Sequence, residues 1–111
     1  MRSGKLPGLS NRPPRGFVGV VSAELFVPGS RSLKDKRMVL RKVRDQLSRR
    51  CGASVAEIGY QDLWQRAQMV IAVAASDPGV LGETLATARG VLEGHDWVLV
   101  RAHEEVIEVD A

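Results

Sequence analysis

The topology of this chain follows from residues 32–52, SLKDKRMVLRKVRDQLSRRCG. Ser32 is a good N-cap, and Asp35 three residues later completes a pair that resembles a capping box. Gly52 suits the left-handed conformation that ends many helices. With a turn of about 100° per residue, six apolar residues fall on one arc of roughly 120°; they are Leu33, Val39, Leu40, Val43, Leu47 and Cys51. The pattern predicts a helix over residues 32–50 with one face in the core.

Strand patterns lie on both sides of this helix. Residues 17–27, FVGVVSAELFV, are β-branched and aromatic and end at a Pro-Gly turn, so they predict a central strand that is buried for part of its length, with Glu24 interrupting one face. Two further strands are predicted over residues 53–58 and 67–75. Residues 97–102 predict a fourth strand, which residues 104–110 either prolong or follow after a bend.

A second helix is predicted between the third and fourth strands. Asp77 is a suitable cap and Pro78 suits the first helical position. Apolar residues then recur on one helical face, at Leu81, Leu85, Ala88 and Leu92. The resulting βαββαβ order predicts an α+β, ferredoxin-like fold with an antiparallel sheet of order 4-1-3-2 and both helices on one face. In this topology the start of the first helix meets the loop of residues 59–66, which we call the rim loop.

Length and composition indicate one globular domain. The chain has 111 residues, of which 44% are apolar and 26% charged. Residues 1–15, MRSGKLPGLSNRPPR, predict a flexible basic arm, for which an extension from start-site choice is the alternative. Residues 16–111 form the predicted domain. No apolar stretch approaches the roughly 20 residues of a membrane span, and the single cysteine suits a reducing compartment. We therefore expect a protein of a reducing compartment without a membrane partner.

Charge is divided unevenly along the chain. Residues 1–51 carry 13 Lys/Arg and 3 Asp/Glu, hence +10, whereas residues 52–111 carry 3 Arg and 10 Asp/Glu, hence −7; together they give the net +3. Such a division indicates an anionic partner, although the two halves would also attract each other within the fold or across a dimer. The predicted nucleic-acid-binding residues are the cations at and beyond the start of the first helix: Arg31, Lys34, Lys36, Arg37, Arg41 and Arg44.

Four of these cations, Lys34, Arg37, Arg41 and Arg44, form one stripe of about 15 Å at a rise of about 1.5 Å per residue. This length matches a few phosphates, and a solvated helix face is the alternative. Lys36 differs because it falls inside the apolar arc. It must either form an ion pair with a carboxylate, Glu57 or Asp62, or extend to the rim and contact a phosphate.

The rim loop supplies a second set of candidates, Gln61, Asp62, Trp64, Gln65 and Arg66. Their polar groups can order the loop through bonds to the backbone or line a site. Trp64 can stack on a base or close the end of the core. We expect it in the core, because the chain has few other aromatic residues.

No catalytic residue, metal site or cofactor is predicted. Cys51 lies in the apolar arc, where cysteine behaves as a small hydrophobe. His95 and His103 lack the spacing of zinc ligands, and phosphate-binding glycine motifs are missing from the sequence. Lys36, Glu57 and Asp62 at the rim are the residual candidates for a hydrolase.

Two segments carry a resemblance to a known family. They are SLKDKR, residues 32–37, and VAEIGYQDLWQRA, residues 55–67. On these motifs the chain resembles the YlxP-like proteins, a small bacterial family of unknown function, over roughly residues 16–110. The resemblance implies a ferredoxin-like fold and a cytoplasmic protein. Genes of this family often lie beside genes for translation initiation and ribosome maturation, which implies an RNA or ribosome context.

Two functional hypotheses follow. The first is a non-enzymatic protein that associates with RNA or a ribosomal subunit through the basic helix. The alternative is a homodimeric protein-interaction or small-molecule-sensing module that uses the open face of the sheet.

Overall fold

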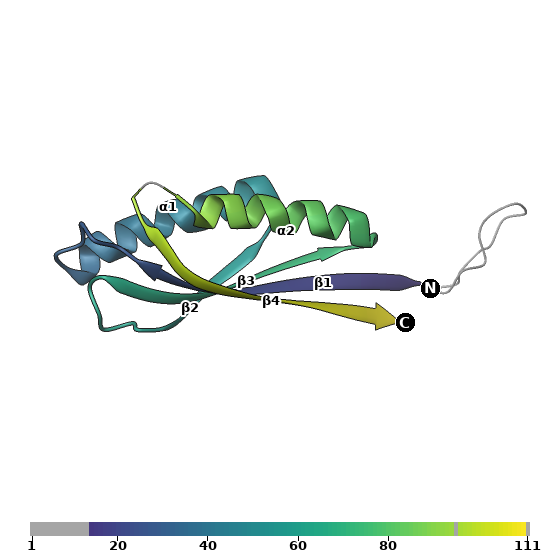
Figure 1. The fold of residues 1–111 in the computed structure, drawn as a ribbon, viewed down its shortest axis with the longest axis horizontal. Coiled ribbons are helices and arrows are strands. Elements are labelled where there is room, and N and C mark those ends of the chain that lie inside the picture. Colours follow the sequence, from purple (N-terminus) through teal and green to yellow (C-terminus); the bar gives the residue numbers. More distant parts are fainter. Residues whose placement is uncertain (1–13, 95, 111) are drawn as a thin grey trace, which may run out of the picture.

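The computed structural model describes residues 14–94 and 96–110, so residues 1–13 of the predicted basic arm lie outside the described part. Six elements follow one another in the order βαββαβ (Figure 1). They are β1 Arg15–Phe26, α1 Leu33–Cys51, β2 Ser54–Gly59, β3 Arg66–Ala75, α2 Pro78–Leu92 and β4 Val98–Asp110. The predicted order of elements is confirmed, and most boundaries lie within one or two residues of the expectation.

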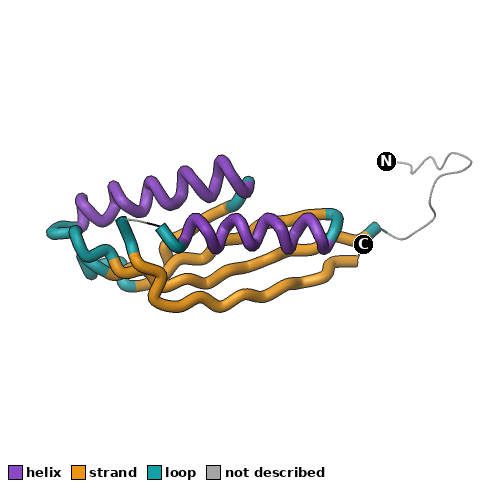
Figure 2. Tube along the Cα trace, turned by 45° about the horizontal axis from the view of Figure 1, so that its top comes forward, coloured by secondary structure: helices purple, strands orange, loops and turns teal. Residues whose placement is uncertain are grey.

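The four strands form one antiparallel sheet in the order β2-β3-β1-β4. Read from the other edge, this is the predicted order 4-1-3-2. Both helices cover the same face of the sheet and leave the other face open (Figure 2). The ferredoxin-like prediction is therefore confirmed, with β1 in a central position and β2 and β4 at the two edges.

The core lies between the sheet and the two helices. Alternate residues of β1 and β3 point toward the helices, and Ala23, Leu25 and Met69 are fully buried there. Helix α1 contributes Leu40, Val43 and Leu47. A Cβ at Gly19 would come within 2.8 Å of a Leu85 methyl carbon, so glycine at this position of β1 allows α2 to pack closely.

The ends of α1 follow their sequence signals. The Ser32 hydroxyl accepts a hydrogen bond of 3.0 Å from the Asp35 N–H, and the Asp35 carboxylate accepts one of 3.0 Å from the Arg31 N–H. Gly52 ends the helix at φ 60°, where a side chain would be strained. Local interactions thus determine where α1 begins and where it ends.

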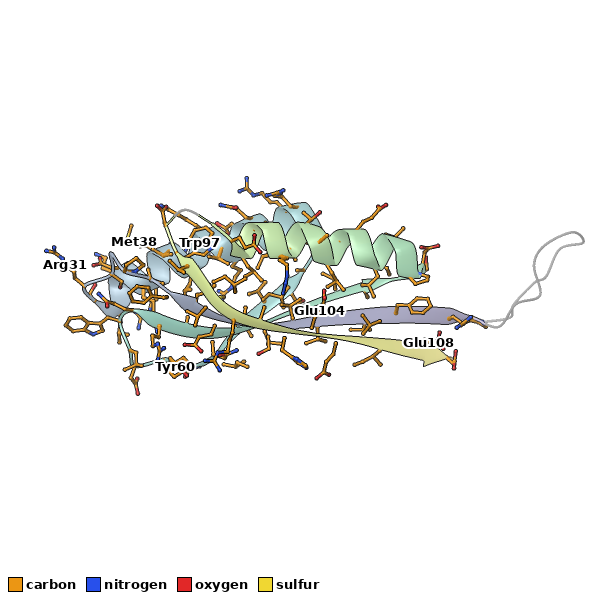
Figure 3. All side chains as sticks on the ribbon, viewed as in Figure 1. Arg31, Met38, Tyr60, Trp97, Glu104 and Glu108 are labelled. Carbon is orange, nitrogen blue, oxygen red and sulfur yellow. The ribbon has the colours of Figure 1, made fainter. Side chains whose placement is uncertain are left out.

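Strand β4 runs without interruption to Asp110, which decides between the two predicted courses of the C-terminal segment. Its register with β1 shifts only opposite Glu24 and Leu25. Arg15, expected at the end of the flexible arm, instead begins β1 and forms a salt bridge with Glu108 on β4. Beyond the end of β3, the start of β1 and the end of β4 continue as a pair of strands. Figure 3 shows Glu108 near the end of this pair.

Candidate nucleic-acid interface

Lys36 is the centre of the contact between α1 and the rim loop. Its side chain is buried, with 1% of the residue exposed, and its Nζ lies 2.9 Å from Glu57 Oε2. The same ammonium donates to the carbonyls of Tyr60, Gln61 and Arg66 at 2.9, 3.3 and 3.1 Å. Of the two carboxylates expected, Glu57 is the partner.

Lys36 is therefore withdrawn from the nucleic-acid-binding residues, and its assignment to that set is wrong. A buried ammonium surrounded by four oxygens has no donor left for a phosphate. The physical reason is its position within the apolar arc of α1, which directs the side chain beneath the rim loop. Its role is to hold both ends of that loop.

The rim loop, whose residues 60–65 connect β2 to β3, is further fixed by its glutamines. Gln65 Nε2 donates to the carbonyls of Pro28 and Ser30 at 3.2 and 3.0 Å. Gln61 Nε2 donates to the Glu57 carbonyl at 3.1 Å. Both side chains thus order the backbone, which was one of the two roles expected for them. Gln65 joins the rim loop to the turn that precedes α1, and Gln61 joins it to the end of β2.

Tyr60 begins the rim loop in the left-handed conformation, at φ 58°. This conformation is unfavourable for a residue other than glycine, and surrounding bonds must maintain it. The Tyr60 carbonyl accepts from Lys36 Nζ and from the Leu63 N–H, at 2.9 and 3.0 Å. The turn is consequently specified by its tertiary contacts as well as by its own sequence.

The remaining predicted cations lie on the surface. Lys34, Arg37, Arg41 and Arg44 are exposed along one flank of α1, and we call these four residues the cationic stripe. Arg31 extends from the turn before the helix (Figure 3). Among the described residues, none of these five side chains forms a salt bridge. By contrast, Lys42 on the opposite flank lies 3.7 Å from Asp96.

The acidic half of the chain does not neutralise the stripe. Helix α1 packs beside β2, whereas the acidic strand β4 forms the opposite edge of the sheet. Within the described residues, the carboxylates of β4 that form salt bridges do so with Arg15 and His103. Among the described residues of one chain, the cations of the stripe are therefore not paired with the carboxylates of the acidic half.

Trp64 is exposed, and the expectation that it closes the core is wrong. The residue has 55% of its surface accessible, whereas Trp97 has only 4%. Trp97 fills the end of the core beside α2, and its indole N–H donates to the Leu92 carbonyl at 3.0 Å. Since Trp97 takes the core position, Trp64 remains at the surface of the rim loop.

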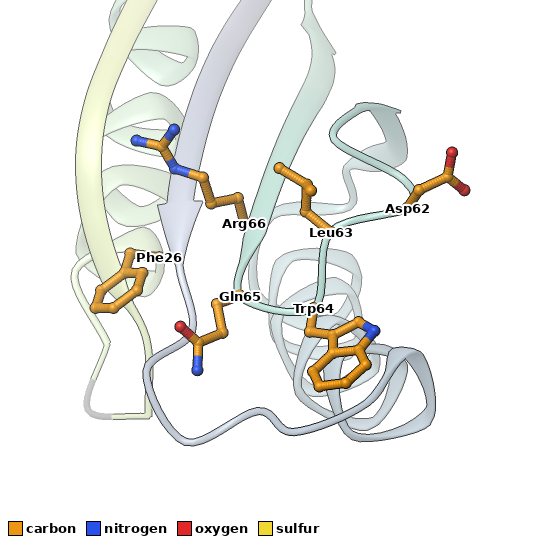
Figure 4. Close-up of a pocket in the computed structure, with 6 residues that line it drawn as sticks. All are labelled: Phe26, Asp62, Leu63, Trp64, Gln65 and Arg66. Carbon is orange, nitrogen blue, oxygen red and sulfur yellow. The ribbon is translucent and has the colours of Figure 1, made fainter.

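A hollow of about 460 Å³ opens beside Trp64 (Figure 4). It is lined by Phe26, Asp62, Leu63, Trp64, Gln65 and Arg66. Phe26 and Arg66 are opposite each other in the register of β1 with β3, at the end of the open face of the sheet. Figure 4 shows that the Asp62 carboxylate points away from the other side chains. Sequence reasoning missed Phe26, because a non-local strand pairing brings it to the rim. It also missed Leu63, because only the polar and aromatic residues of the rim loop were considered.

Arg66 is the first residue of β3 and is held by charged and aromatic neighbours. Its guanidinium lies 3.0 Å from Glu24 Oε2, and its carbon is 5.4 Å from the centre of the Tyr60 ring. Glu24 is buried on the open face, and Arg101 approaches its other oxygen at 3.4 Å. Two arginines thus compensate one buried carboxylate, and Asp62 supplies a second negative charge at the lining of the hollow.

Other chemistry is limited among the described residues. They contain no group of three His, Cys, Asp or Glu side chains that would suit a metal ion. The thiol of Cys51 is partly buried, and burial raises its pKa above the usual value despite the nearby Arg50. A raised pKa disfavours the nucleophilic thiolate. No helix within the described ranges is long and apolar enough to span a membrane.

Comparison with known proteins places the chain in a family. Residues 18–104 match the family described as "Protein of unknown function (DUF503)". The chain belongs to this family. It is also 37% identical over 60 residues to the uncharacterized protein YlxP of Bacillus subtilis (strain 168). That match spans 54% of this chain and 65% of the relative's length. The resemblance drawn from the two motifs is thereby confirmed.

One solved structure can be compared at the level of shape. It is described as "Structural Genomics, protein YJCS", with a TM-score of 0.48 and 6% sequence identity. The alignment covers 79% of this chain and 96% of that one.

Proposed function

We propose that this protein binds RNA, as a ribosome-associated cytoplasmic factor, through the cationic stripe and the adjoining rim loop. The observation that carries the proposal is the exposure of five cations, Arg31 and the stripe, without a carboxylate partner in the described residues. Unpaired cations in a row attract a polyanion and release its counterions. The lone free thiol of Cys51 suits a reducing compartment.

The geometry supports a strand of phosphates along α1. The stripe is about 15 Å long at a rise of about 1.5 Å per residue, and Arg31 prolongs it toward the rim loop. The bonds from Gln65 to Pro28 and Ser30 place the rim loop directly beside Arg31. Phosphate contacts on the stripe and base contacts at the rim would then lie along one path.

Salt dependence of RNA binding tests this proposal. A labelled single-stranded RNA is titrated with the protein, and anisotropy gives the Kd between about 50 and 200 mM salt. Each phosphate contact contributes about 0.7 to the slope of log affinity against log salt concentration, so five contacts give a slope near 3.5. Affinity should then fall by about 100-fold over this range. The same salt series with purified ribosomal subunits, followed by sedimentation, tests the ribosomal association. Failure to bind RNA at the lowest salt would contradict the proposal.

A homodimer through the open sheet face is the second candidate, because aliphatic side chains lie uncovered there. Val18, Val20 and Val70 are partly exposed on this face, and Ile107 and Val109 are about half exposed beside them. An uncovered apolar face favours a protein partner. A sensing role would place a small ligand on the same face.

Sedimentation velocity distinguishes this second candidate from a monomer. At micromolar concentrations wild-type protein should sediment as a dimer, and Val20→Lys should sediment as a monomer because it places a charge in the apolar contact. Val80→Lys, at an exposed position of α2, is the matched control and should remain dimeric. A wild-type protein that stays monomeric at high concentration would exclude this alternative.

A further inference from the structure

We infer that the hollow at the end of the open sheet face binds one unpaired nucleobase, which stacks on Trp64. This inference rests on the proposed function and adds to it a preference for single-stranded over duplex RNA. The stripe recognises phosphates, which both forms of RNA present. The hollow can accept only a base that is not paired and stacked within an RNA duplex.

The walls of the hollow are apolar and aromatic. Trp64 is 55% exposed, and Leu63 and Phe26 are also accessible from solvent. Figure 4 shows these three side chains around the same space as Arg66. A gathering of large exposed apolar groups indicates a ligand surface, and an aromatic ring offers a face on which any base can stack.

The loop that carries Trp64 is held before any ligand arrives. Lys36 binds the carbonyls of Tyr60, Gln61 and Arg66, and Gln65 binds those of the turn before α1. The Val27 N–H also donates to the Gln65 carbonyl at 2.8 Å. Because the backbone on both sides of Trp64 is fixed, little conformational entropy is lost when a ligand binds.

Charge distinguishes a nucleotide from a neutral apolar ligand. Arg66 is oriented by Glu24 and by the Tyr60 ring, and a guanidinium has five N–H donors. Donors not used by Glu24 are available for a base edge or a phosphate. A second cation, the exposed Arg31, follows Ser30, whose carbonyl accepts a hydrogen bond from the Gln65 side chain. Asp62 also lines the hollow, but its carboxylate points away from the other side chains (Figure 4). A planar ring that carries a phosphate therefore complements Arg66, Arg31 and the aromatic walls.

Tryptophan fluorescence tests the inference in the full-length protein. The probes are a short oligoadenylate, an RNA duplex of the same length and inorganic polyphosphate. We expect the oligoadenylate to quench the exposed Trp64, because the base stacks on its ring, whereas Trp97 is shielded in the core. Polyphosphate should bind without quenching. Trp64→Ala should weaken oligoadenylate binding by about 10-fold or more, with little effect on polyphosphate.

Two further variants separate stacking from a structural effect. Trp64→Phe retains an aromatic face and should keep most of the oligoadenylate affinity. Val80→Ala removes a similarly exposed apolar group on α2 and should leave the affinity unchanged.

The outcomes distinguish this inference from the proposed function. If oligoadenylate binds Trp64→Ala as tightly as wild type and causes no quenching, the base site is overturned while the RNA-binding stripe stands. If neither oligoadenylate nor polyphosphate binds at low salt, the proposed function is overturned and the base site with it. A shift of Trp64 emission with protein concentration alone would assign the hollow to a second copy of the chain and would also overturn the inference.

Discussion

Replacing Lys36 by methionine is expected to lower the free energy of unfolding by about 3 kcal/mol. Methionine keeps the volume and apolar stem of the side chain, so no cavity forms. The ammonium is lost, however, and Glu57 and three carbonyls of the rim loop lose their donor. The value lies at the lower end for a broken buried pair because 21% of the Glu57 side chain remains accessible to water.

Urea unfolding followed by circular dichroism measures this effect. Lys34→Met is the matched control, since Lys34 lies two residues away on the exposed side of α1 and its replacement should change stability by about 0.5 kcal/mol or less. Combining Lys36→Met with Glu57→Met should cost less than the sum of the single changes, because the second removes an unpaired carboxylate. Equal stability of the two lysine variants would show that the Lys36 network does not support the rim loop.

Neutralising the stripe should produce the largest change in RNA affinity. The triple variant Arg37→Gln, Arg41→Gln and Arg44→Gln removes three of the proposed phosphate contacts while it retains good helix formers. Each phosphate contact adds about 0.7 to the slope of log affinity against log salt concentration. Losing three contacts therefore corresponds to more than two decades of affinity at about 50 mM salt, and we expect binding to weaken by about 100-fold or more. The slope of affinity against salt should also decrease by about 2.

The opposite flank of α1 offers a control of equal charge. Lys42→Gln, Arg49→Gln and Arg50→Gln also remove three cations, but Lys42 lies near Asp96 and Arg49 donates to the Asp45 carbonyl. Anisotropy with the same single-stranded RNA should show a much smaller loss for this variant. A similar loss in both variants would mean that net charge, rather than the stripe, attracts RNA. Unfolding measurements on both proteins would establish that neither change disturbs the fold.

Lys36 and the stripe are expected to contribute to different parts of the proposed interface. Lys36 and the stripe belong to the same helix, yet the former is buried and the latter is exposed. The Lys36 change should therefore alter stability and the position of Trp64, whereas the stripe changes should alter affinity at constant stability. If Trp64 contributes to binding as inferred, Lys36→Met should weaken the binding of single-stranded RNA more than the binding of polyphosphate.

The helix α1, its caps and its cationic stripe could be predicted from sequence because they depend on neighbours a few residues apart. Ser32, Asp35 and Gly52 act through local backbone bonds, and a helical repeat assigns each side chain to a face. The same holds for the order of elements, from which the topology follows. Family membership also followed from two contiguous motifs within residues 32–67.

Only the tertiary structure decided which long-range partners these residues meet. Trp64 and Trp97 both follow polar segments, and the space beside α2 accommodated Trp97. Lys36 had two candidate carboxylates, and the packing of α1 against β2 brought Glu57 to it. Phe26 reaches Arg66 through a strand register that spans 40 residues of sequence. Such choices depend on how elements pack in three dimensions, and the periodicity of a single segment carries no information about them.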